Sequence, residues 1–246
     1  MAFKKELEVF SHDIDTNRFA TPTAVVRYMQ ETVDSNLKEC KPTYEELLHS
    51  NLSFVVSRTA LEVYRPLKEY EHITVETWAT EGKTAIFPRS FIIRSGEETV
   101  AKCLMLWALV NTRESRFMRG SEFSVQSYGT GDAVELKVPP RFKMPADITL
   151  KKCGQKTVMY SDIDRNFHMN NTKYFDMLFD YIPNRAKIFM SSCLVNYANE
   201  APLGSNIEIY ISDGACENGE AIYYMRTEID GKTNIEAKVG VKDIDR

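Results

Sequence analysis

The sequence predicts an α+β fold made of two similar units, each a long apolar helix wrapped by an antiparallel sheet. The first observation is a repeat: residues 9–22 and 158–171 share a polar frame about 149 positions apart, in which Asp15 matches Asp164. The second is that an amphipathic segment follows each copy, and segments rich in branched and aromatic residues follow that segment. A helix too apolar to stand in water needs a sheet to bury it, which gives the α+β class.

The first unit opens with alternating charged and apolar residues at 6–10, which predict a strand. Thr21 and Pro22 predict a helix start, because a hydroxyl cap precedes a proline that can occupy the first helical position. Apolar residues then recur at spacings of three and four as far as Leu37, so one long amphipathic helix is expected. Residues 54–111 predict a meander of four or five strands.

The second unit repeats this order after a connector at 112–145 that is rich in arginine, glycine and proline. Residues 157–160 predict a strand, Asn170 takes the cap position that Thr21 holds in the first unit, and Pro183 ends the second helix. Further strands are predicted at 188–197, 207–212, 221–229 and 233–241.

The expected domain boundaries follow from this repeat. We predict a first unit at 1–128, a linker at 129–146 and a second unit at 147–246. The first unit has about 16 additional residues, placed around 40–52, so its connection from helix to sheet is longer. The two units are expected to lie side by side and to share sheet edges that would otherwise be open to aggregation.

Composition limits the classes of function. Hydrophobic residues at 43%, charged residues at 27% and a net charge of −4 are typical of a soluble globular protein and give no reason to expect nucleic acid as a partner. No apolar stretch resembles a signal peptide or a membrane span, so we expect a cytoplasmic protein without membrane insertion. Five scattered cysteines without a Cys-x-x-Cys pair disfavour disulfides and a zinc site, and we expect neither a metal nor a cofactor.

The two copies of the polar frame differ at one position that matters for chemistry. His168 in the second copy corresponds to Phe19 in the first, so only the second copy has a group that titrates near neutral pH. Asp164, Asn166 and His168 are spaced by two, and in an extended segment such side chains point the same way. The free backbone N–H groups of a helix beginning near Asn171 could hold an oxyanion. Asp164 and Asn166 could equally serve only to shape a turn.

A longer motif around this histidine resembles a known family. Residues 161–174, Ser-Asp-Ile-Asp-Arg-Asn-Phe-His-Met-Asn-Asn-Thr-Lys-Tyr, are similar to the pattern Ser-Asp-x-Asp-x-Asn-x-His-x-Asn-Asn-x-x-Tyr of the acyl-acyl carrier protein thioesterases of plants and bacteria. Residues 76–78, Glu-Thr-Trp, and 196–200, Asn-Tyr-Ala-Asn-Glu, give further matches. The resemblance implies a double hotdog fold and hydrolysis of the thioester between a fatty acyl chain and acyl carrier protein.

The resemblance also implies the catalytic residues. The family's set falls on Asp164, Asn166, His168 and Glu200, and the cysteine that follows the glutamate in plant members is Ala201 here. A covalent acyl-cysteine mechanism therefore loses its candidate nucleophile, and single-step hydrolysis by an activated water is expected. The sequence leaves open whether Glu200 or His168 is the general base.

By the same resemblance, the first unit holds the acyl chain between helix and sheet. The expected substrate-binding residues are Asn170, Asn171, Trp78, Phe54 and Phe87, with Phe91 and Trp107 as further lining.

Acyl carrier protein is the expected partner, and it is acidic. The densest basic cluster, Arg113, Arg116 and Arg119, is therefore a candidate docking site. Because the two units can pair within one chain, the sequence permits a monomer or a homodimer. Two alternatives remain open: a hotdog thioesterase acting on acyl-CoA, and a non-catalytic sensor of acyl thioesters.

Overall fold

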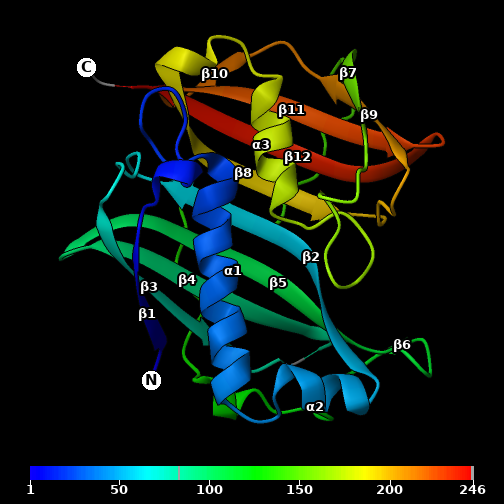
Figure 1. Ribbon diagram of the computed structural model, residues 1–246. Helices are drawn as coiled ribbons and strands as arrows, with labels where there is room; N and C mark the ends of the chain where they lie inside the picture. Colours follow the sequence, from blue (N-terminus) through cyan, green and yellow to red (C-terminus); the bar gives the residue numbers. More distant parts are fainter. Residues whose placement is uncertain (83, 245–246) are drawn as a thin grey trace.

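The computed structural model describes residues 1–82 and 84–244, which form one twisted sheet of 12 strands with the α-helices on one face (Figure 1). The helices are α1 (Pro22–Glu39), α2 (Tyr44–His49) and α3 (Lys173–Asp180). The first-half strands are β1 (Phe3–Glu8), β2 (Leu52–Val63), β3 (His72–Ala79), β4 (Ile86–Ser95), β5 (Glu98–Asn111) and β6 (Arg116–Phe117). The second-half strands are β7 (Lys151–Thr157), β8 (Ile188–Tyr197), β9 (Asn206–Ile211), β10 (Ala215–Glu217), β11 (Glu220–Ile229) and β12 (Lys232–Asp243).

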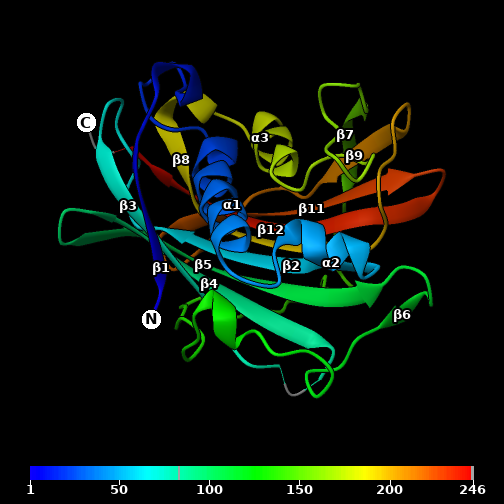
Figure 2. The same cartoon turned by 60° about the horizontal axis from the view of Figure 1, so that its bottom comes forward.

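The strand order shows that the two halves repeat one topology. The first half runs β1-β3-β4-β5-β2, and the second half runs β8-β12-β11-β9-β7 in the reverse direction across the sheet. The halves meet where β2 and β8 pair antiparallel, with Ala60 opposite Leu194 at the centre of the register. Figure 2 shows α1 and α3 lying on the same side of this continuous sheet. The predicted α+β class and the shared sheet edge are confirmed.

Helix α1 begins where the sequence predicts. The hydroxyl of Thr21 accepts the N–H of Ala24 (3.2 Å), and Pro22 occupies the first helical position. One stripe of the helix, including Val25, Met29 and Val33, is buried against the sheet. Each such side chain contributes roughly 1.5 to 3 kcal/mol when removed from water, so packing rather than helix propensity stabilises α1.

The additional residues of the first half form a short helix of their own. Thr43 and Glu46 make a reciprocal capping box at the start of α2, with each side chain bonded to the backbone of the other. The predicted longer connection around 40–52 therefore contains α2, which lies beside the start of β2 (Figure 2).

Several predicted boundaries in both units are wrong by a few residues. The first strand ends at Glu8 and β7 ends at Thr157, so both strands stop before the polar frame rather than leading into it. Helix α3 begins at Lys173, and Thr172 rather than Asn170 holds the cap position. The side-chain oxygen of Asn170 instead accepts the N–H (2.9 Å) and the hydroxyl (2.7 Å) of Thr172, which folds a turn ahead of the helix.

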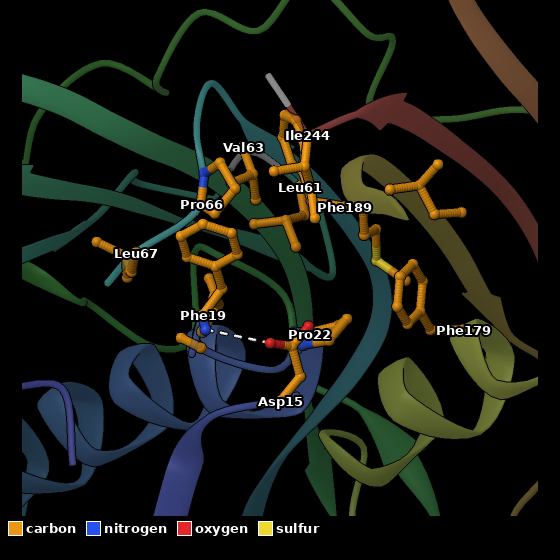
Figure 3. Close-up of a pocket in the computed structure, with 14 residues that line it drawn as sticks. Asp15, Phe19, Pro22, Leu61, Val63, Pro66, Leu67, Phe179, Phe189 and Ile244 are labelled. Carbon is orange, nitrogen blue, oxygen red and sulfur yellow. Dashed lines mark hydrogen bonds between the residues drawn. The ribbon is translucent and has the colours of Figure 1, made fainter. Parts of the chain in front are cut away.

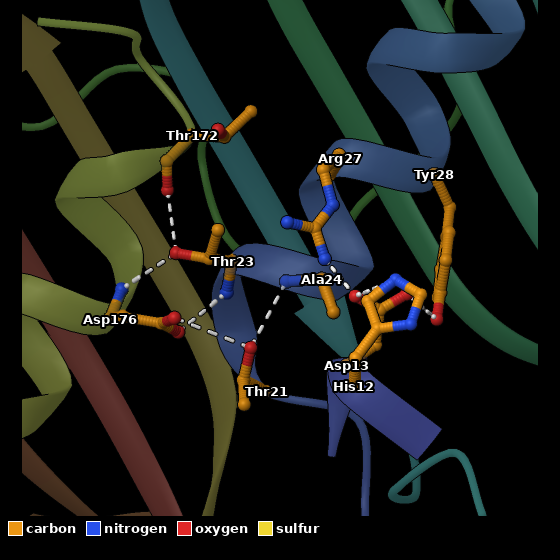
Figure 4. A network of polar contacts seen from close by, with 9 residues as sticks. All are labelled: His12, Asp13, Thr21, Thr23, Ala24, Arg27, Tyr28, Thr172 and Asp176. Atoms are coloured by element: carbon orange, nitrogen blue, oxygen red, sulfur yellow. Dashed lines mark hydrogen bonds and ion pairs between the residues drawn. The ribbon is translucent and has the colours of Figure 1, made fainter. Parts of the chain in front are cut away.

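The amino ends of α1 and α3 meet through a network of polar contacts (Figure 4). The carboxylate of Asp176 in α3 accepts the N–H of Thr23 (2.8 Å) and the hydroxyl of Thr21 (3.3 Å) at the start of α1. The hydroxyl of Thr23 donates to the carbonyl of Thr172 (2.8 Å) and accepts the N–H of Asp176 (3.1 Å). Each helix thus satisfies free N–H groups of the other, which fixes the two halves around the space between them.

Over the described part of the chain, none of the helices has the length and apolar character needed to cross a membrane.

Candidate active site

The polar frame folds into the same tight turn in both halves. The N–H of Asp15 donates to the carbonyl of Phe19 (2.8 Å), and the N–H of Asp164 donates to the carbonyl of His168 (3.1 Å). The residue that precedes Phe19 or His168 has a left-handed backbone in each copy, with φ of +62° at Arg18 and +64° at Phe167. The expectation that Asp164, Asn166 and His168 lie on an extended segment is therefore wrong, because the aspartate closes the segment into a turn.

Asp164 shapes this turn through both of its carboxylate oxygens. One oxygen accepts the N–H of Asn166 (2.8 Å), and the other accepts the side-chain amide of Asn170 (3.3 Å). In the first half, Asp15 likewise accepts the N–H of Asn17 (2.8 Å). Asp164 therefore orients its neighbours Asn166 and Asn170.

His168 and Glu200 lie side by side, and we call them the acid–base pair. The N–H of Met169, the residue after His168, donates to the carbonyl of Ala201, the residue after Glu200 (2.8 Å). This bond holds the two segments together and so places His168 beside Glu200. The distance from Nε2 of His168 to Oε1 of Glu200 is 3.7 Å. The histidine side chain is 21% exposed and the glutamate side chain is 72% exposed, so the pair stands at the boundary between protein and solvent.

The acid–base pair opens into a cavity of about 750 Å³ between the two halves. One wall comes from α1 and the first-half sheet and is mostly apolar, with Val26, Val33, Leu37, Phe54, Val56, Phe91, Met105 and Trp107 beside polar residues such as Gln30 and Asp34. The opposite wall is polar and comes from the second half: Asp164, Asn166, His168, Asn170, Asn171 and Glu200. The structure therefore brings together all four predicted catalytic residues and three of the five predicted substrate-binding residues.

Trp78 and Phe87, the other two predicted substrate-binding residues, do not line this cavity. Alternation along β3 directs Thr77 towards α1, so Trp78 lies on the opposite face, where its indole N–H donates to the carbonyl of Asp132 (2.7 Å). Phe87 is 2% exposed and packs edge-to-face against Phe54, with ring centroids 6.0 Å apart, so it supports a lining residue from behind.

The arginines predicted to bind the carrier protein lie in and beside the short hairpin of β6. Arg116 pairs with Glu114 (2.7 Å) and Glu122 (2.9 Å), which neutralise its charge locally. The backbone N–H of Arg119 also donates to Glu122 (2.9 Å). The positive charge of this cluster is therefore smaller than the sequence alone suggests.

Two tyrosines of the cavity were not predicted from the sequence. The hydroxyl of Tyr197 donates to the carbonyl of Asn171 (3.4 Å), and its ring meets Tyr174 edge-to-face at 5.8 Å. Burial raises the pKa of Tyr174 to about 12 and raises that of Tyr197 as well, so both phenols stay protonated at neutral pH. Both tyrosines fall within segments that resemble the family, Tyr174 in 161–174 and Tyr197 in 196–200, so the resemblance could have pointed to them.

Two family models cover most of the chain. One, described as the acyl-ACP thioesterase N-terminal domain, matches residues 1–128, and the other, described as the C-terminal domain, matches residues 146–242. The chain belongs to the acyl-ACP thioesterase family. Among curated relatives, a dodecanoyl-[acyl-carrier-protein] hydrolase of Cinnamomum camphora is 24% identical over 97% of this chain and 67% of that protein. Another from Umbellularia californica is 25% identical over 89% and 62%. The chain thus spans about two thirds or less of the length of these relatives.

Solved structures show the same architecture. An acyl-ACP thioesterase of Bacteroides thetaiotaomicron aligns with a TM-score of 0.85 at 19% identity, covering 98% of each chain. The 12:0-ACP thioesterase of Umbellularia californica aligns with a TM-score of 0.83 at 21% identity, covering 99% of this chain and 94% of that one. The double hotdog fold implied by the sequence is confirmed.

This acyl-ACP thioesterase family member also contains a degenerate counterpart of its candidate site, in the first half. The Ala20 N–H donates to the carbonyl of Leu67 (2.9 Å), as Met169 does to its partner in the second half. Phe19 and Pro66 therefore occupy the positions equivalent to the acid–base pair. Figure 3 shows both residues in an apolar pocket whose cavity volume is only about 30 Å³. This counterpart pocket therefore lacks a histidine–glutamate pair and is too small to hold a fatty acyl thioester.

No cysteine lines the cavity in the described residues 1–82 and 84–244 of this family member. Cys103 and Cys193 are buried within the sheet, and burial raises the pKa of both thiols, which keeps them protonated and unreactive. Ala201 occupies the position after Glu200 and is 1% exposed. The same part of the chain contains no cluster of three or more histidine, cysteine or acidic side chains suited to a metal ion.

Proposed function

We propose that this protein hydrolyses fatty acyl thioesters of acyl carrier protein, releasing a free fatty acid and the holo-carrier protein. The observation that carries the proposal is the position of the acid–base pair among polar side chains at one side of a largely apolar cavity, in a chain of the acyl-ACP thioesterase family. A fatty acyl thioester has the same division into a polar reacting group and an apolar tail.

The apolar wall supports an extended acyl chain. Val26, Val33 and Leu37 of α1 face the cavity, and residues 26 and 37 lie roughly 16 Å apart along the helix axis at 1.5 Å per residue. The second-half residues that line the cavity include the turn at Asp164 and the segment before α3, so the thioester carbonyl belongs at that end. The tail then extends along α1 into the first half.

The proposed reaction is a single hydrolytic step. His168 or Glu200 takes a proton from water, the water oxygen attacks the thioester carbonyl carbon, and the carbon–sulfur bond breaks as the leaving thiolate of the pantetheine arm receives a proton. Asn166 donates to the carbonyl oxygen or positions the water, and Asp164 holds Asn166 in place. A positioned general base contributes about 10² to 10⁴ in rate.

The test compares release of fatty acid from acyl carrier protein and from acyl-CoA by the wild type, His168→Ala and Glu200→Gln. We expect the wild type to prefer the carrier-bound thioester and both variants to lose about 10²-fold or more in kcat. Equal hydrolysis by all three proteins would refute the proposed site. Binding of acyl carrier protein without hydrolysis would favour the sensor, and preference for acyl-CoA would favour the acyl-CoA thioesterase.

The docking role of Arg113, Arg116 and Arg119 remains part of this proposal. Charge reversal at these positions is expected to raise KM for the carrier-bound substrate and to spare acyl-CoA. Equal effects on both substrates would refute it. A cytoplasmic location and a monomeric or homodimeric state stay predictions.

A further inference from the structure

Arg165, which lies between Asp164 and Asn166, directs its side chain out of its own half of the molecule. Its guanidinium donates to the carboxylate of Asp34 in α1 (3.2 Å). Its Cζ also lies over the ring of Tyr44 in α2, 3.6 Å from the ring centroid. All three residues line the cavity, so this Arg165 bridge joins the turn of the second half to the helices that border the acyl groove.

The turn has few other contacts that fix its position across the cavity. The hydrogen bonds of Asp164 to Asn166, Phe167 and His168 lie within the turn and set its shape. Phe167, with its left-handed backbone, is 78% exposed and does not anchor the turn by burial. A stacked guanidinium and an ion pair, by contrast, hold the turn relative to α1 and α2.

Among the described residues of the first half, this bridge has no equivalent. Thr16 stands at the position of Arg165, and the nearby Arg18 pairs instead with Glu69 of its own half (2.6 Å). The thioesterase pattern leaves the position of Arg165 open to any residue, so the bridge is a feature of this chain rather than of the motif. The contrast between the halves links the bridge to the half that contains the acid–base pair.

We propose that Arg165 is a positioning residue for thioester hydrolysis, because its bridge to Asp34 and Tyr44 holds Asp164 and Asn166 in register with the acyl groove. The inference rests on the proposed function, since the reaction that it serves is the one proposed above. It predicts an effect on turnover rather than on binding.

The kinetic test uses dodecanoyl and palmitoyl thioesters of acyl carrier protein with Arg165→Ala, Arg165→Lys and Tyr44→Leu. We expect Arg165→Ala to lower kcat roughly tenfold with KM unchanged, equivalent to about 1.4 kcal/mol of transition-state stabilisation. Arg165→Lys keeps the charge but loses the planar stack, so it should recover part of the loss. Tyr44→Leu removes the ring and should lower kcat in the same direction as Arg165→Ala; wild-type kinetics in Tyr44→Leu would overturn the role of the stack.

Arg18→Ala is the matched control, because it breaks an exposed ion pair at the equivalent turn of the first half. It should leave kcat and KM unchanged. Wild-type kinetics in Arg165→Ala would overturn the proposal. A raised KM at unchanged kcat would also overturn it, since Arg165 would then bind substrate. A kcat loss matched by a fall in the fraction of folded enzyme would assign Arg165 a purely structural role.

A second measurement needs no substrate and separates this inference from the proposed function. Arg165→Ala should accelerate hydrogen exchange at the backbone amides of Asn166 and Phe167, while exchange in α1 remains as in the wild type. Unchanged exchange at these amides would refute the bridge. If the wild type hydrolyses no thioester but the exchange prediction holds, the proposed function is wrong, while the inference that Arg165 fixes the position of this turn is still supported.

Discussion

The contact between the amino ends of α1 and α3 makes a quantitative prediction about stability. Asp176→Ala removes the carboxylate that accepts the N–H of Thr23 (2.8 Å) and the hydroxyl of Thr21 (3.3 Å). Thr21 keeps its bond to the N–H of Ala24, but the N–H of Thr23 loses its partner. A buried donor without a partner costs about 1 to 3 kcal/mol, and loss of an anion at a helix amino end costs about 0.3 to 1 kcal/mol.

Relief of the buried charge offsets part of this loss, so we expect Asp176→Ala to lower the free energy of unfolding by about 2 kcal/mol at neutral pH. For a chain of this length that corresponds to a fall in Tm of roughly 4 to 8 °C, measured by calorimetry. Asp176→Asn keeps an acceptor for Thr23 and should cost less. Asp180→Asn, which changes an exposed acid of the same helix, should stay within about 0.5 kcal/mol of the wild type.

The pH dependence of Asp176 gives an independent check. Burial raises its pKa above the ordinary value of 3.8, so the folded state binds the proton more tightly than the unfolded state. This contribution to stability is fully present below the unfolded pKa and is lost as pH rises through the folded pKa. The wild type should therefore gain stability relative to Asp176→Asn as the pH falls towards 4. A difference that is constant with pH, or an Asp176→Ala variant within about 0.5 kcal/mol of the wild type, would contradict this role of Asp176.

Further predictions concern the acyl groove and the thiols. Val33→Trp fills the groove partway along α1 and should lower kcat/KM for the longest acyl chains roughly tenfold relative to shorter ones; a uniform loss across a panel of chain lengths would contradict the placement of the tail. Alkylation of the exposed thiols Cys153 and Cys216 with iodoacetamide should leave the rate of hydrolysis unchanged. Inactivation in proportion to labelling would show that a thiol takes part.

The repeat made the architecture predictable from the sequence. Thr21 and Pro22 start α1 by local chemistry alone, and the two apolar helices require a sheet that wraps them. The pairing of β2 with β8 then follows from two units that each have an open sheet edge.

The parts that the sequence did not predict depend on which contacts form in the folded chain. Spacing by two suits a strand as well as a turn, and the local hydrogen bonds of Asp164 with Asn166, Phe167 and His168 produce the turn. The face on which Trp78 lies depends on the register of β3, since a shift by one residue would reverse it. The Arg165 bridge joins residues 131 positions apart and has no local signal.

The most direct test of the account is a single turnover of acyl carrier protein thioester in H₂¹⁸O. If water activated by the acid–base pair attacks the carbonyl in one step, the fatty acid released in the first turnover carries one ¹⁸O. Unlabelled fatty acid in the first turnover would contradict the account, because its new oxygen would then come from an enzyme carboxylate through a covalent intermediate.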